Sequence, residues 1–271
     1  VKYIVYIIKG VVIGIATLIP GVSGGTMAII LGVYDDIIHS ISSFFKDMKK
    51  NIIFLGTVGI GGLIGLFAFS GLIELALQHF KFPMVYLFIG AIIGGIPVLY
   101  KKASAEAIKV KDWVFFVIGV AIILIMSLYN GTIVNLANST GVLQFIFLFF
   151  AGIIIAVALI LPGLSTSFML LAIGLYEITL NAFSTRNLGY LIPLGLGAVA
   201  GVLGTTRLLE NCMQKKPKQT YLLILGFVIG SIADIVLDTG LPTGWNIVLS
   251  VATLALGILV IRMLSEKFGE G

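Results

Sequence analysis

The chain has 271 residues, of which 59% are hydrophobic and 11% charged, and its mean hydropathy is +1.16. A soluble domain carries roughly 25% charged residues, so this composition excludes a soluble globular protein and indicates one embedded in a membrane. The net charge of +5 does not indicate a nucleic-acid-binding protein, because the Lys and Arg residues stand in short clusters between apolar runs.

Seven apolar runs reach or approach the roughly 17 to 25 residues that cross a bilayer. They cover residues 52–73, 83–100, 113–129, 143–161, 188–206, 221–237 and 246–261. The apolar stretch that opens the chain resembles a signal sequence, but it contains Lys9 and no small-residue cleavage site, so we interpret it as retained. The sequence therefore predicts an all-α integral membrane protein.

The stretch IPGVSGGTMAIILGVYD, residues 19–35, interrupts this opening apolar run. Pro20 lacks an amide hydrogen and disfavours helix in the residue before it, so we expect a first short helix to end there. Ser23 is a good N-cap for a second helix. Irregular backbone at membrane depth is tolerated only where protein or a watery cavity surrounds it, so this break indicates a site.

The same pattern recurs as LPGLSTSFMLLAIGLYE at residues 161–177, with Pro-Gly-x-Ser and a later Gly-x-Tyr before an acid. A second block, 61–97, aligns without a gap with 197–233. An internal duplication of this kind predicts two homologous halves. The predicted units are a first repeat over 1–135, with a hairpin tip at 20–26, and a second repeat over 142–271, with a tip at 162–167.

Glycines at a spacing of four residues occur at matching positions in both halves. This spacing lets two membrane helices approach closely, so we expect these glycines to lie at helix contacts. The pairs are Gly61 with Gly65, Gly90 with Gly94, and their mates Gly197 with Gly201 and Gly226 with Gly230.

The distribution of basic residues predicts the topology. If each broken segment enters and leaves on the same face, all of the 17 Lys and Arg residues except Lys81 and Arg186 lie on one side, as expected for the cytoplasmic face. Each half is then a re-entrant helical hairpin plus three transmembrane helices, and the halves form an inverted repeat with both termini cytoplasmic. The two tips should approach each other near the midplane. Two full spans in place of each hairpin would give the same parity and are the alternative.

The two tips have the features of an anion site. A helix N-terminus carries about half a positive charge and free amide groups, so two that face each other would bind a negatively charged group. The alternative is that Pro-Gly-x-Ser only shapes a packed hairpin, and that Arg207 pairs with Glu210 three residues later. The candidate phosphate-binding residues are Ser23, Gly24, Gly25, Thr26, Ser165, Thr166, Ser167 and Arg207.

These motifs resemble a bacterial membrane family. The Pro-Gly-x-Ser-Gly-Gly-Thr tip followed by Leu-Gly-Val-Tyr-Asp at 31–35, the copy of both in the second half, and the eight-segment layout are similar to the polyprenyl-phosphate transporter (PopT) family. The resemblance implies transport of undecaprenyl phosphate, the lipid carrier of cell-wall synthesis, from the outer to the inner leaflet of the bacterial cytoplasmic membrane. The second tip departs from the pattern, because it has Thr166-Ser167 where the first has Gly-Gly.

A phosphate head would need an energy source to return to the cytoplasm. A phosphate monoester carries about 1.5 to 2 negative charges, so moving it inward against 100 mV costs about 4 kcal/mol. We therefore predict alternating access coupled to a proton or a sodium ion. The candidate carboxylates are Glu74, its repeat mate Glu210, Asp35 and Glu177. For Glu74 and Glu210, a solvated position at the membrane interface is the alternative.

Two other functions fit parts of the sequence. A secondary transporter of a small anionic solute would have the same architecture. An intramembrane serine hydrolase or lipid phosphatase would use the Gly-x-Ser-Gly around Ser23, but a serine nucleophile needs a base. The chain contains only His39 and His79, which we expect in solvent, and the single Cys212 with no His or Cys cluster predicts no metal site. We expect no cofactor and no enzymatic activity.

Overall fold

The computed structural model of the chain describes residues 2–18, 23–105, 107–128, 141–164, 166, 169–170 and 173–268. These residues form helices and turns, and no strand occurs among them. In chain order the helices are α1 (Lys2–Thr17), α2 (Gly24–Ile30), α3 (Tyr34–Ser42), α4 (Met48–His79), α5 (Lys81–Ala103), the 3-10 helix η1 (Val110–Asp112), α6 (Trp113–Leu128), α8 (Val142–Ile160), α10 (Tyr176–Ser184), α11 (Leu188–Lys215), α12 (Pro217–Thr239) and α13 (Trp245–Phe268).

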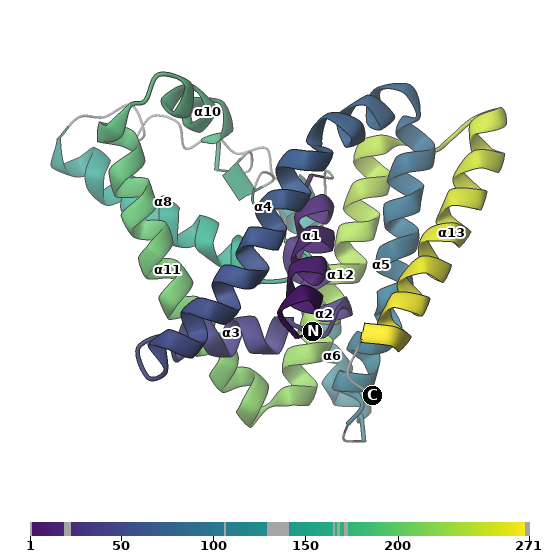
Figure 1. The fold of residues 1–271 in the computed structure, drawn as a ribbon, viewed down its shortest axis with the longest axis horizontal. Helices are drawn as coiled ribbons and strands as arrows, with labels where there is room; N and C mark the ends of the chain where they lie inside the picture. Colours follow the sequence, from purple (N-terminus) through teal and green to yellow (C-terminus); the bar gives the residue numbers. More distant parts are fainter. Residues whose placement is uncertain are drawn as a thin grey trace.

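Seven helices in the described part of the chain are long and apolar enough to cross a membrane, namely α4, α5, α6, α8, α11, α12 and α13. They coincide with the seven apolar runs of the sequence, so the prediction of an all-helical membrane protein is confirmed. In Figure 1, α1 begins and α13 ends in the lower part of the molecule, where α3 also lies, whereas α10 lies at the upper edge.

The opening apolar stretch is interrupted where the sequence predicts. α1 ends at Thr17 and α2 begins at Gly24, while Pro20 falls in the segment 19–22, outside the described residues. α2 has only seven residues and is followed by a turn in which Gly32 has a φ of +66°. Glycine adopts this conformation without the steric cost that a side chain imposes, so the chain can turn here into α3.

The turn after α2 has a counterpart 142 residues later, which is the offset between the two tip motifs (161 minus 19). The amide of Val33 donates to the carbonyl of Ala28 at 2.9 Å, and the amide of Leu175 donates to that of Leu170 at 2.8 Å. The glycines of the two Gly-x-Tyr motifs have similar φ values, +66° and +72°. The two copies of this motif therefore fold into the same turn.

Glycines bring pairs of helices into backbone contact. α1 packs on α4 as α8 packs on α11, and α5 packs on α13 as α12 packs on α6. A Cβ atom added at Gly61 would lie 2.2 Å from the carbonyl oxygen of Ile7, and one added at its mate Gly197 would lie 1.9 Å from that of Phe149. The repeated glycines of α5 and α12 meet α13 and α6 as closely. The predicted role of these glycines in helix packing is confirmed, and such close packing stabilises helices in lipid, where burial from water contributes little.

The core of the molecule surrounds α2. Residues 26–30 of this helix are all buried, and the helix packs against α5. A Cβ atom added at Gly95 of α5 would lie 2.2 Å from Cγ1 of Ile30, so the two helices approach closely there. α5 also contacts α12, which comes from the other half of the sequence. Protein therefore encloses the segment that follows the first break, as irregular backbone at membrane depth requires.

Candidate phosphate-binding site

The first tip is a capped and tightly packed helix start. Ser23 has an extended backbone (φ −89°, ψ 132°), and its side-chain oxygen accepts a hydrogen bond from the Gly25 amide at 3.2 Å. The N-cap predicted at Ser23 is therefore confirmed. Ser23 and Thr26 are buried, and a Cβ atom added at Gly24 would lie 2.8 Å from Cγ2 of Thr17 in α1. The helix start thus lies inside the protein, folded back against the end of α1.

The two tips lie against each other. A Cβ atom added at Gly25 would lie 3.4 Å from Cα of Pro162 and 3.6 Å from its Cγ. On the other side of the second tip, Gly163 has a φ of +85°, and an added Cβ there would lie 2.7 Å from the carbonyl carbon of Phe227 in α12. The second tip therefore contacts the first through Pro162, and it approaches the α12 backbone because glycine follows that proline.

A buried hydrogen bond joins the two halves beside the tips. The hydroxyl of Tyr34 donates to the carbonyl oxygen of Ile160 at 2.7 Å, and both residues are buried. Ile160 ends α8, where the carbonyl groups of the last turn have no partner within the helix. Tyr34 therefore caps the helix that leads into the second tip. The repeated Gly-x-Tyr motif marked this tyrosine in the sequence but gave no sign of its partner.

The remaining predicted phosphate ligands are only partly visible. Ser165 and Ser167 lie outside the described residues, and Thr166 is half-buried. Arg207 is exposed on α11, and among the described side chains no ion pair joins it to Glu210, so the predicted alternative of such a pair is not observed. Binding of phosphate by these four residues stays a prediction.

Glu210 is held by two residues of α3. Nδ1 of His39 lies 2.5 Å from Oε1 of Glu210, and the hydroxyl of Ser42 donates to Oε2. Gln214 also donates to Oε1, at 3.3 Å. We expected His39 in solvent, and its side chain is 65% exposed, but it is paired with Glu210. No sequence signal connects these residues, because they lie in different halves.

Glu74, the repeat mate of Glu210, has fewer partners. It is exposed on α4 and accepts a hydrogen bond from Gln78 at 3.3 Å, which copies the bond from Gln214 to Glu210. Among the described side chains, none from α10 is recorded at Glu74. The two equivalent carboxylates are thus in different surroundings.

Asp35 belongs to a charged cluster that joins α3, α5 and α12. Lys102 forms an ion pair with Asp35, and the hydroxyl of Tyr221 lies 3.0 Å from each of the carboxylate oxygens. The Lys102 ammonium group also lies 5.3 Å from the centre of the Tyr221 ring. Sequence reasoning identified Asp35 but missed both partners. The side chain of Glu177, the repeat mate of Asp35, lies outside the described residues.

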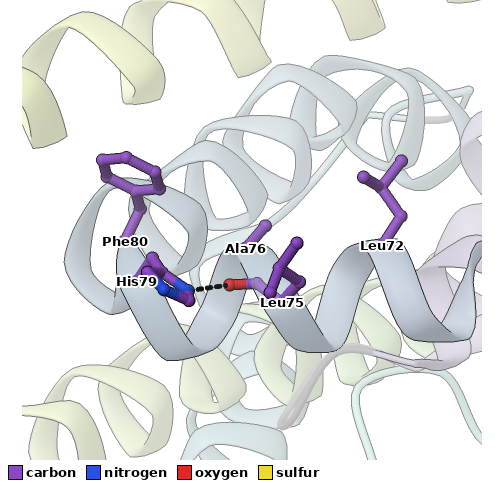
Figure 2. Close-up of a pocket in the computed structure, with 5 residues that line it drawn as sticks. All are labelled: Leu72, Leu75, Ala76, His79 and Phe80. Atoms are coloured by element: carbon purple, nitrogen blue, oxygen red, sulfur yellow. Dashed lines mark hydrogen bonds between the residues drawn. The ribbon is translucent and has the colours of Figure 1, made fainter.

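The two histidines bond to groups other than Ser23. Nδ1 of His79 lies 3.0 Å from the carbonyl oxygen of Leu75, as Figure 2 shows, and His39 pairs with Glu210. His79 lies in a shallow, mostly apolar depression at the end of α4, lined by Leu72, Leu75, Ala76, His79 and Phe80. Within the described part of the chain, no group of three or more His, Cys, Asp or Glu residues is placed to hold a metal ion.

Comparison with known proteins decides the family. A family model described as undecaprenyl phosphate translocase-like matches residues 13–243, a stretch that includes both tips. The chain belongs to this family. A polyprenyl-phosphate transporter of Staphylococcus aureus (strain NCTC 8325 / PS 47) is 33% identical over 267 residues, covering 93% of this chain and 92% of that protein. The resemblance seen in the tip motifs is therefore confirmed.

A second curated relative is more distant. It is a polyprenyl-phosphate transporter of Vibrio cholerae serotype O1 (strain ATCC 39315 / El Tor Inaba N16961), 27% identical over 252 residues, which cover 86% of this chain and 78% of that protein. No solved structure matches the chain.

Proposed function

We propose that this chain transports a polyprenyl phosphate across the bacterial cytoplasmic membrane by alternating access, with the phosphate head held between the two tips. The contact between Gly25 and Pro162 carries the proposal, because it brings the two broken segments together inside the protein. The substrate is supported by the family match and by two relatives that are named polyprenyl-phosphate transporters.

The mechanism uses an inverted repeat of two re-entrant hairpins, each followed by three spans. Three observations support this architecture: the interruption between α1 and α2, the turn that recurs with an offset of 142 residues, and the reciprocal packing of α5 with α13 and α12 with α6. α3 and α10, which follow the two tips, lie at opposite edges of the molecule in Figure 1. The first hairpin then enters from the cytoplasm and the second from outside, with both termini cytoplasmic.

The chemistry of the tips suits a phosphate head on a long apolar tail. The first amides of a helix point toward an anion and carry the positive end of the helix dipole. Gly24 and Gly25 leave room for the head at this backbone, and the Ser23 hydroxyl can still donate while it accepts from Gly25. Thr26, Thr166, Ser165 and Ser167 add hydroxyl donors. The tail stays in lipid, so only the head needs a polar path.

Arg207 is the cation that we assign to this path. It lies in the last part of α11, toward the end at Lys215, and so away from the tips along the helix. Its guanidinium group can form two parallel hydrogen bonds with a phosphate. We therefore place its contact with the head on the cytoplasmic side of the site rather than at the tips.

Coupling to an ion offsets the cost of moving the head inward. A carboxylate that carries a proton across must be free to exchange partners, and Asp35 is already bound to Lys102 and Tyr221. Glu74 and Glu210 are therefore the better candidates, and Glu177 stays a third. Transport with and without an imposed proton or sodium gradient identifies the ion.

A liposome assay tests the function. Purified protein is reconstituted with polyprenyl phosphate in the outer leaflet, and a phosphatase that cannot cross the membrane reports how much lipid is still outside. The wild type should protect a growing fraction of the lipid. Gly25→Val should protect little, because its γ carbons would collide with Pro162, whereas Gly56→Val should behave as wild type, because nothing lies within 4 Å of an added Cβ there.

Other outcomes of this assay would contradict the proposal. A protected fraction no larger than in protein-free liposomes would exclude lipid transport under these conditions. Release of inorganic phosphate without added phosphatase would favour a lipid phosphatase. Uptake of a small anion by liposomes that do not move the lipid would favour the small-solute transporter.

A further inference from the structure

The helices that follow the two tips make unequal contacts. α3 packs on α11 of the other half. α10, its repeat mate, packs on α11 of its own half, and in the described part of the chain it makes no comparable packing with α4, the mate of α11. Figure 1 shows α10 and the upper end of α4 well apart. A contact between the halves is therefore formed on one side of the molecule and absent on the other.

The residues of the formed contact have counterparts on the other side. With the hairpin offset of 142, His39 corresponds to Asn181 and Ser42 to Ser184; with the offset of the second block (197 minus 61, or 136), Glu210 corresponds to Glu74. Glu210 is 21% exposed and bound to His39 and Ser42. Glu74 and Asn181 are both exposed. The sequence thus retains a carboxylate on both sides, with an amide in place of the imidazole on the outer side.

We infer that the contact of His39 and Ser42 with Glu210 is a gate that closes the cytoplasmic side, and that Asn181 and Glu74 form the matching gate at the outer face. This inference rests on the proposed alternating access. In an inverted repeat, each half can adopt the arrangement that the other half has in the opposite state. α10 then docks on α4 when α3 leaves α11, so that one face is closed whenever the other is open.

The two gates differ in strength because their partners differ. An imidazole that is protonated binds a carboxylate through a charge-assisted hydrogen bond, whereas the amide of Asn181 offers only a neutral donor. The cytoplasmic gate is therefore the stronger one, and the resting protein faces outward, where the proposed substrate arrives. Exchanging the two residues should reverse this preference.

Distances between spin labels on each face test the gates without any transport measurement. In a Cys212→Ser background, one label pair replaces Ser43 and Lys215 on the cytoplasmic side, and its repeat-mate pair replaces Thr185 and His79 on the outer side. These four positions flank the gate residues and leave them unchanged. Pulsed EPR on the purified, full-length protein then reports which gate is closed.

The wild type should show a single short distance across the cytoplasmic pair and a longer one across the outer pair. His39→Asn makes the two gates alike, so the ratio of cytoplasm-closed to cytoplasm-open protein should fall by about tenfold, the effect of losing one charged hydrogen bond. Asn181→His should raise the outer-closed population by a similar factor. The double exchange should invert the wild-type ratio.

Unchanged distance distributions in both His39→Asn and Asn181→His would overturn the gate assignment, even if lipid transport is normal. A shift in the cytoplasmic pair alone would show a contact on one side without a matching outer gate, which also overturns it. The two variants act on opposite faces, so loss of folding in one leaves the other to decide. If the labels shift as expected but liposomes do not move the lipid, the proposed substrate is wrong and the gates stand.

Discussion

The two hairpins share a motif and a turn, yet they differ in what they contact. In the first half, Tyr34 is 3% exposed and caps α8 through Ile160, and α3 reaches across to Glu210. In the second half, Tyr176 is only half-buried, and among the described residues its hydroxyl has no recorded hydrogen-bond partner. The repeated sequence therefore determines the local backbone, whereas the contacts between halves depend on the state in which the whole protein is folded.

The largest effect should come from the second tip. Gly163→Ala places a side chain at a φ of +85° and within 2.7 Å of the α12 backbone. Strain of this kind and the overlap together cost about 2 to 6 kcal/mol, enough to prevent folding of a marginally stable protein. The yield of monodisperse protein in detergent measures the effect. Gly195→Ala in α11, where an added Cβ meets nothing within 4 Å, is the control and should purify as wild type.

The tyrosines of the two Gly-x-Tyr motifs sharpen the comparison between halves. Tyr34→Phe leaves the buried carbonyl of Ile160 without its donor, which should cost about 1 to 3 kcal/mol. Tyr176→Phe removes a hydroxyl with no recorded partner and should cost clearly less. Thermal unfolding in detergent measures both Tm values. Equal shifts for the two variants would mean that the bond seen in this structure does not distinguish the halves.

The charged cluster around Asp35 should have the smallest effect on stability. The Asp35 side chain is 45% exposed and that of Lys102 is 25% exposed, so water screens much of their attraction. Asp35→Asn should lower stability by no more than about 1 kcal/mol. It should also leave the dependence of transport on an ion gradient intact, because Asp35 is already paired. Loss of that dependence in Asp35→Asn, with Glu210→Gln unaffected, would move the coupling role to Asp35.

Features that depend on local sequence could be predicted. Run length and hydropathy located the seven spans, Pro20 and Ser23 located the break and the new helix start, and repeated glycines located the close helix pairs. Each of these follows from a property of one short segment: its length, a missing amide hydrogen, or a missing side chain.

Contacts between distant segments could not be predicted. Tyr34 and Ile160 are 126 positions apart, and His39 and Glu210 are 171 apart. Whether such side chains meet depends on how each helix is rotated and on which face of the membrane is closed, and neither is encoded in a local pattern. The same reason explains the missed Lys102 partner of Asp35.

The central claim is that the amides of the first tip bind the phosphate head. Solid-state NMR of protein loaded with polyprenyl phosphate tests it through the dipolar coupling between the lipid phosphorus and the amide nitrogens of Gly24 and Thr26. A hydrogen-bonded phosphate places these nuclei about 4 Å apart or closer, so strong coupling is expected at both. Protein that holds the lipid but shows no coupling at either amide would contradict binding at the tips.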